Sequence, residues 1–143
     1  MAEEGKTFRA SFGLKGIVQH QLDQSYHSPL IEKLRAAGYA LKTGRLEIHL
    51  AREFGFCYGV ERAVEYAYET RARFPDRRIF LTNEIIHNPR VNAELQGMGV
   101  KILADDVSRA EITENDVVIM PAFGVPVEAL REFQKKGCVI VDT

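Results

Sequence analysis

From residue 46 onward, short apolar segments alternate with longer segments of helical periodicity. Most of the short segments are apolar throughout, which is typical of strands that are buried on both faces of a sheet. Repeated strand–helix units favour a parallel sheet, because parallel neighbours need a crossover connection and a helix supplies it. We therefore expect an α/β fold with a mostly parallel, four- to five-stranded sheet and flanking helices. The predicted strands span residues 46–51, 79–83, 100–104, 117–121 and 138–141.

The first 45 residues follow a different pattern. Residues 1–24 are polar and weakly periodic, so we expect an extended or partly disordered arm. One helix follows, with Ser28 as its N-cap and Gly38 at its end. We predict two units, an amino-terminal extension with one helix over residues 1–45 and a first α/β lobe over residues 46–143.

The composition excludes several classes of protein. Of 143 residues, 45% are hydrophobic and 27% are charged, as in one soluble globular domain. The formal charge of −1 provides no basic field for nucleic acid. No apolar run approaches the roughly 18 residues of a membrane-spanning helix, and the amino terminus lacks a signal or transit composition. We expect a cytoplasmic protein that binds neither nucleic acid nor membrane.

A cysteine between two glycines is the first candidate functional residue. Cys57 stands between Gly55 and Gly59, directly before a predicted helix. A helix amino terminus favours a thiolate, which is the form that binds metals or attacks electrophiles. Free cysteines are also among the most buried residues, so a small hydrophobe in a tight turn is the alternative.

A histidine next to a helix start is the second candidate. Asn88 is a good N-cap and Pro89 suits the first helical position, so the N–H groups of that turn form a potential anion site. His87 lies beside it and could add a charge-assisted contact to a phosphate. The alternative is a capped helix with a solvated histidine.

The other candidates are weaker. The segment 121–126, which contains Phe123, is another strand end with a glycine, and without further signals it indicates only a turn. Cys138 lies in an apolar strand and is expected in the core. The four histidines show no zinc-site spacing, and no phosphate-binding glycine motif occurs.

Taken together, two segments resemble one family, the LytB/IspH family of 4-hydroxy-3-methylbut-2-enyl diphosphate reductases. These are Gly-Phe-Cys-Tyr-Gly-Val-Glu-Arg-Ala at residues 55–63 and Asn-Glu-Ile-Ile-His-Asn-Pro at residues 83–89. The likeness covers about residues 24–143. The start of the chain looks like the amino-terminally extended branch of the family, and the whole looks like a protein truncated to its first lobe.

The resemblance implies one lobe of a three-lobed enzyme around a [4Fe–4S] cluster. Cys57 matches the first of three cluster cysteines, and His87, with Asn88 beside it, matches the position that binds the substrate diphosphate. In the family, reduced ferredoxin or flavodoxin supplies two electrons. The allylic diphosphate loses its hydroxyl group as water, which gives isopentenyl and dimethylallyl diphosphates in the non-mevalonate isoprenoid pathway.

The chain departs from the family pattern at two places. Many members have a histidine where this chain has Phe123, and the extended branch tends to have phenylalanine there. The family's second cysteine follows an Asp-Thr pair, and this chain ends at Thr143, before that cysteine and before the catalytic glutamate. We therefore expect the chain by itself to be inactive.

Two further hypotheses stay open. One is a non-catalytic α/β module that binds anions at His87 and Asn88. The other is a fragment whose exposed faces pair in a homo-oligomer.

If Cys57, His87 and Phe123 belong to one site, they should converge at the carboxyl ends of the strands, because right-handed crossovers place such turns on one edge of the sheet.

Overall fold

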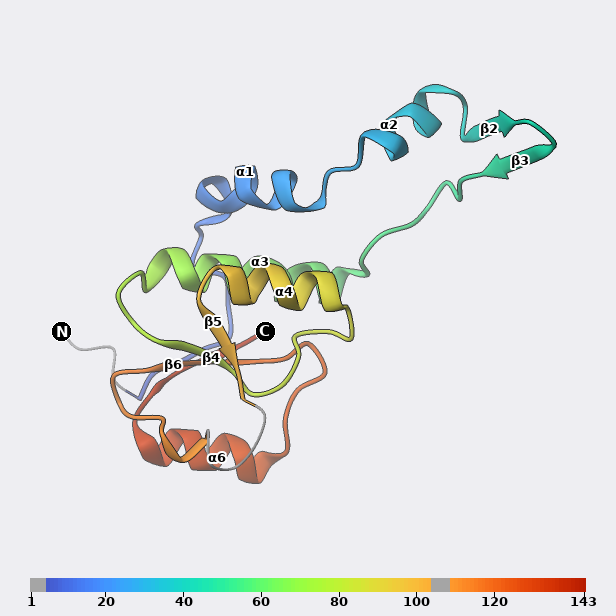
Figure 1. Cartoon of the computed structure of the whole chain (residues 1–143). Helices are drawn as coiled ribbons and strands as arrows, with labels where there is room; N and C mark the ends of the chain where they lie inside the picture. Colours follow the sequence, from blue (N-terminus) through green and yellow to red (C-terminus); the bar gives the residue numbers. More distant parts are fainter. Residues whose placement is uncertain (1–4, 104–108) are drawn as a thin grey trace.

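A five-stranded parallel sheet forms the centre of the molecule (Figure 1). The computed structural model describes residues 5–103 and 109–143. The spatial order of the strands is β1-β7-β6-β4-β5, and every neighbouring pair is parallel. The predicted α/β class is confirmed. The strands of this sheet are β1 (Thr7–Phe8), β4 (Ile79–Leu81), β5 (Val100–Ile102), β6 (Val117–Met120) and β7 (Val139–Asp142).

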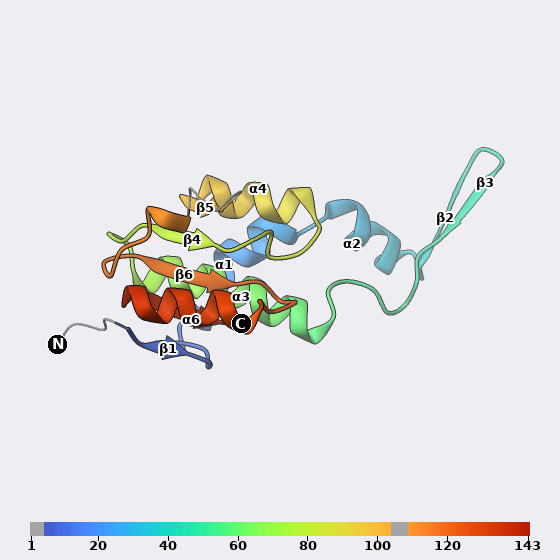
Figure 2. The ribbon, with the colours of Figure 1, turned by 90° about the horizontal axis from the view of Figure 1, so that it is seen from below.

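Helices cover both faces of the sheet. In Figure 1, α3 and α4 lie above it, α1 lies above α3, and α6 lies below. Figure 2 shows the same layers from below, with α6 in front. The described helices are α1 (Lys15–Tyr26), α2 (Pro29–Ala36), α3 (Tyr58–Arg73), α4 (Pro89–Gly97) and α6 (Val127–Lys136).

The core divides at the sheet, because successive side chains of a strand point to opposite faces. In β4, Ile79 and Leu81 pack with the residues under α3 and α4, whereas Phe80 packs toward α6. Strands β6 and β7 alternate in the same way. All three residues of β4 are buried, which explains why the sequence shows continuous apolar strands rather than alternating ones.

The predicted strand over residues 46–51 does not join the parallel sheet. It forms β3 (Leu46–His49), which pairs antiparallel with β2 (Ala40–Thr43) in a separate hairpin. The hairpin projects away from the body together with α2 (Figures 1 and 2). The alternation of apolar and polar residues in this segment fits a hairpin in which only one face is apolar. The predicted boundary between residues 45 and 46 falls inside this hairpin, between its turn and β3.

The amino-terminal extension is more ordered than predicted. Strand β1 pairs with β7 at the edge of the sheet, and α1 packs on α3, so residues 5–26 are part of the body rather than a loose arm. The extension holds two helices, α1 and α2, where one was predicted. Residues 1–4 of the predicted arm, and residue 104 of the predicted third strand, lie outside the described residues. Within the described ranges, no helix is both long and apolar enough to cross a membrane.

Candidate functional site

The loops that carry the candidate residues gather at one end of the sheet. Helices α3 and α4 both begin at the end that faces the projecting hairpin (Figures 1 and 2). Cys57 is the N-cap of α3, and Asn88 is the N-cap of α4. The structure therefore places Cys57 and His87 at the same end of the molecule. For His87 this follows from its place after β4 of the parallel sheet. For Cys57 the predicted reason is wrong, because β3, the strand before it, lies in the separate hairpin.

The Cys57 thiol is exposed and forms no disulfide. Its backbone is extended (φ −69°, ψ 160°), and its carbonyl accepts the first helical hydrogen bond, from the N–H of Glu61 at 2.9 Å. The side chain makes no capping hydrogen bond. Because the residue is exposed, the interpretation as a small buried hydrophobe is wrong. A role as a metal ligand stays a prediction.

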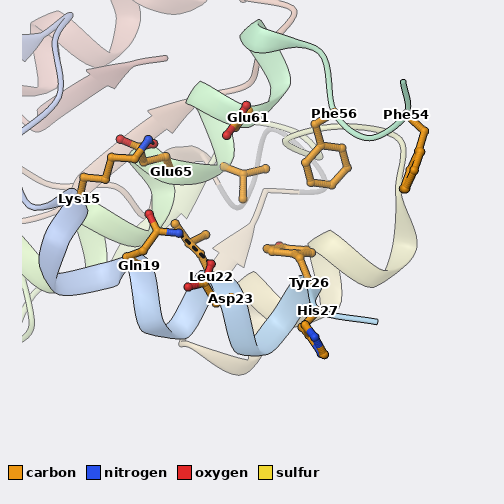
Figure 3. Close-up of a pocket in the computed structure, with 11 residues that line it drawn as sticks. Lys15, Gln19, Leu22, Asp23, Tyr26, His27, Phe54, Phe56, Glu61 and Glu65 are labelled. Carbon is orange, nitrogen blue, oxygen red and sulfur yellow. Dashed lines mark hydrogen bonds and ion pairs between the residues drawn. The ribbon is translucent and has the colours of Figure 1, made fainter. Parts of the chain in front are cut away.

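The loop before Cys57 packs on the extension. The ring of Phe56 meets that of Tyr26 edge-on, with the ring centres 5.7 Å apart (Figure 3). The two rings line a groove of about 570 Å³ between α1 and α3, in which Lys15 and Glu65 form an ion pair of 2.7 Å. Burial is the main cause that raises the pKa of Tyr26 above its ordinary value. The extension thus contacts the residue next to the candidate cysteine.

Asn88 caps α4 with its side chain. Its Oδ1 accepts from the backbone N–H groups of Arg90 (3.1 Å) and Val91 (3.3 Å). These are the N–H groups that a bare helix terminus would offer to an anion. Oδ1 is therefore occupied, and a contact between the Asn88 side chain and a ligand would involve Nδ2.

The loop that carries His87 is held by a buried asparagine. Asn92 accepts from the N–H of Ile85 at 3.3 Å and donates from Nδ2 to the carbonyl of Ile86 at 2.9 Å. Both isoleucine side chains are buried. Asn92 was not among the residues expected from the sequence. Its position one helical turn after Asn88, on the same face of α4, was the available signal.

His87 lies between a carboxylate and an aromatic ring. Its Nδ1 is 2.9 Å from Oε2 of Glu84. Its ring stacks on Phe123 with ring centres 5.7 Å apart and an angle of 20° between the planes. The predicted approach of His87 and Phe123 is confirmed. Glu84 was not among the site residues expected from the sequence, although it lies three residues before His87 in the same loop.

A small cavity of about 300 Å³ lies beside this stacked pair. It lies between the loop after β4 and the loop after β6, and Pro126 at the start of α6 also lines it. The hydroxyl of Thr82, which lines this cavity, is buried and has no hydrogen-bond partner within residues 5–103 and 109–143. The arrangement offers a histidine, a carboxylate and a hydroxyl group at one end of the sheet.

The second cysteine belongs to the core, as predicted. Cys138 is buried, and its Sγ donates to the carbonyl of Phe133 at 3.4 Å. Burial raises the pKa of Cys138 to about 11, so its thiol stays protonated at neutral pH.

The residues of this chain do not fit a complete cluster site. A [4Fe–4S] cluster is ordinarily held by four cysteine thiolates. The chain has two cysteines, of which only Cys57 is exposed. Residues 5–103 and 109–143 contain no group of three or more histidine, cysteine or carboxylate side chains that could hold a metal ion.

Comparison with known proteins agrees with the two motifs. Residues 48–143 match the family described as LytB protein. The 4-hydroxy-3-methylbut-2-enyl diphosphate reductase of Gloeobacter violaceus is 47% identical over 95% of this chain, and that of a Nostoc species is 48% identical over 94%. This chain covers 34% of each relative, so it spans about a third of their length.

A solved structure is also similar. It is that of (E)-4-hydroxy-3-methyl-but-2-enyl diphosphate reductase, described as the terminal enzyme of the non-mevalonate pathway. The match has a TM-score of 0.54 and 34% sequence identity, and it covers 64% of this chain and 31% of the other. The sequence match spans more than half of the chain and includes Cys57, His87 and Phe123. The chain belongs to the LytB family.

Proposed function

We propose that this chain supplies the amino-terminal third of a 4-hydroxy-3-methylbut-2-enyl diphosphate reductase. The observation that carries the proposal is the identity of 47% to the Gloeobacter violaceus reductase over 95% of the chain, a stretch that includes both sequence motifs. The reaction is the reductive removal of the allylic hydroxyl group of the substrate. The products are isopentenyl and dimethylallyl diphosphates.

Cys57 is the residue that we propose as a cluster ligand. Its thiol is exposed at the amino end of α3, where the helix dipole favours the thiolate. This thiolate is one ligand of a [4Fe–4S] cluster, and the remaining ligands have to come from outside the described residues. The 143-residue chain by itself is therefore expected to be inactive.

His87 and Asn88 are proposed to bind the substrate diphosphate. His87 is exposed beside a cavity at the start of α4, so it can donate a charge-assisted hydrogen bond to a phosphate oxygen. Asn88 can add a donor through Nδ2, because its Oδ1 already caps the helix. Reduced ferredoxin or flavodoxin is the proposed electron donor, and the proposed location is the cytoplasm.

A chimeric enzyme tests the proposal. Residues 1–143 are joined to the remaining two thirds of the Gloeobacter violaceus reductase, and reductase activity and bound iron are measured after anaerobic reconstitution. We expect an active chimera. Cys57→Ser should abolish activity and lower the iron content, because one thiolate ligand is lost.

Cys138→Ala is the matched control. It removes the buried thiol, so it should cost about 1–3 kcal/mol of stability and leave iron binding and activity in place. Full activity and full iron content in the Cys57→Ser chimera would refute the ligand assignment. A chimera that binds inorganic pyrophosphate but neither iron nor substrate would instead favour a non-catalytic anion-binding module.

A further inference from the structure

We propose that Glu84 is a positioning residue that fixes the orientation of the His87 ring. In this arrangement Nδ1 faces the Glu84 carboxylate, and Nε2 is the ring nitrogen presented to the ligand. The inference rests on the proposed function only for the identity of the ligand, an organic diphosphate. The orientation of the ring is a property of this chain and can be measured on it directly.

Two contacts define the position of the ring. Oε2 of Glu84 is 2.9 Å from Nδ1, which is hydrogen-bond distance. On its flat side the ring stacks on Phe123, at 5.7 Å between ring centres. The His87 side chain is 79% exposed, and among the described residues these two contacts restrict the rotation of its ring.

The backbone that carries Glu84 is itself restrained. Its N–H donates to Oδ1 of Asn83 at 2.8 Å, and the next two residues are buried and bonded to Asn92. The N–H of Asn88 donates to the carbonyl of Ile86 at 2.7 Å. The carboxylate and the imidazole therefore project from one short, hydrogen-bonded loop, unlike two long side chains that meet by chance on a surface.

The hydrogen bond between the Glu84 carboxylate and the His87 imidazole determines which ring nitrogen carries the proton. A carboxylate only accepts hydrogen bonds, so the Nδ1 that faces Glu84 has to carry the proton. In the neutral ring this leaves Nε2 as an acceptor, and in the charged ring Nε2–H is a donor toward the cavity. The carboxylate also balances the charge of an imidazolium, which is the form that binds a phosphate oxygen most strongly.

An exposed ion pair contributes little to the free energy of unfolding. The expected consequence of losing Glu84 is therefore a change in ring state and in substrate affinity, while the fold is kept. This separates a positioning role from a merely structural one.

The ring state can be read from long-range ¹H–¹⁵N correlation spectra of the 143-residue chain at mildly alkaline pH, where free imidazoles are neutral. The His87 signals are assigned by their loss in His87→Gln. We expect the proton of His87 on Nδ1 in the wild type and redistributed toward Nε2 in Glu84→Ala. Glu84→Gln keeps an acceptor oxygen and should retain the Nδ1–H form.

Glu128→Ala is the matched control. Glu128 lies in the first turn of α6 and directly precedes Ala129, which lines the same cavity, so its removal takes away a carboxylate that belongs to a different element from the His87 loop. The His87 tautomer should not change in this variant. An identical tautomer ratio in the wild type and Glu84→Ala would overturn the proposal.

In the chimeric reductase, Glu84→Ala should raise KM about 3- to 10-fold, as expected for the loss of one ordinary hydrogen bond, with a smaller change in kcat. Glu84→Gln should recover part of this loss. If the Glu84→Ala chimera keeps its KM, Glu84 does not position His87 for the substrate. An inactive wild-type chimera would refute the proposed function, whereas the tautomer measurement on the chain would still decide the role of Glu84.

Discussion

At the scale of single residues, the Asp116 carboxylate shows how this fold keeps a buried charge. Asp116 is 2% exposed and accepts from Arg78 Nε at 2.8 Å, from an Arg78 terminal nitrogen at 2.7 Å, and from Thr113 N at 2.8 Å. Burial acts to raise the pKa of Asp116, but the hydrogen bonds from Arg78 and Thr113 outweigh it and hold the pKa below its ordinary value. The ion pair of Arg78 and Asp116 joins the start of β4 to the start of β6.

Asp116→Asn should therefore destabilise the chain in a pH-dependent way. A carboxyl group whose pKa is depressed by folding stabilises the native state above its unfolded pKa of about 3.9, and this contribution is lost as the pH falls through the folded pKa. We expect a loss of about 1–3 kcal/mol at pH 7. The difference from wild type should shrink at about pH 3, as measured by urea unfolding. An equal difference at both pH values would contradict this linkage.

At the scale of secondary structure elements, glycine determines where α6 ends. Gly137 is its C-cap and has φ of 72°, the left-handed conformation that side chains disfavour. Added at Gly137, a Cβ would lie 3.5 Å from the Cβ of Glu114, which is an ordinary contact. The cost of a substitution should therefore come from the backbone.

Gly137→Ala is expected to lower the free energy of unfolding by about 1–2 kcal/mol. Gly97→Ala is the matched control, because Gly97 is the last residue of α4, lacks a positive φ and has open space at its Cβ position. That variant should stabilise the chain by about 0.4–1 kcal/mol. Thermal unfolding of both variants measures the difference. Equal effects would show that the left-handed backbone of Gly137 does not determine the cost of a side chain at the end of α6.

The projecting hairpin has one polar and one apolar face. On one face, Lys42 and His49 both contact Glu47, at 3.6 and 3.2 Å. On the other face, Leu46 and Ile48 remain 66% and 45% exposed. Two-stranded hairpins are marginally stable in water by themselves. Pairing of such exposed faces in a homo-oligomer stays a prediction.

At the scale of the whole molecule, Glu69 connects the extension to the α/β body. Glu69 is fully buried in α3, and its carboxylate accepts from the Ser11 hydroxyl and from the N–H groups of Phe12 (2.7 Å) and Leu14 (3.0 Å). These residues immediately precede α1. One carboxylate thus accepts hydrogen bonds from three donors of the loop that connects β1 to α1.

Glu69→Ala should release this loop. Two partly buried N–H groups would lose their acceptor, so we expect a loss of about 1–3 kcal/mol of stability and faster hydrogen exchange in α1. Glu65→Ala is the matched control, because Glu65 lies one turn earlier on α3 and forms an ion pair with the exposed Lys15. Its effect on exchange should be smaller. Equal exchange rates in both variants would argue against Glu69 as the anchor of the extension.

The sequence by itself determined the buried strands and the helices between them. Continuous apolar segments such as 79–81 and 117–120 are typical of strands that are covered on both faces, and residue type alone encodes this property. The start of α4 was equally predictable, because Asn88 and Pro89 act through local backbone geometry. The likeness of two motifs to one family also required no coordinates.

Only the tertiary structure decided which segments pair with which. The alternation in residues 46–51 indicates a strand with one apolar face, but its partner is β2, and the fifth strand of the sheet is the two-residue β1. The two residues of β1 are too few to show a periodic signal. The position of β1 depends on its pairing with β7, which lies at the other end of the sequence. Glu84 was missed for a related reason. Its role depends on the distance to a ring atom of His87, and distances between side chains are fixed by the folded backbone.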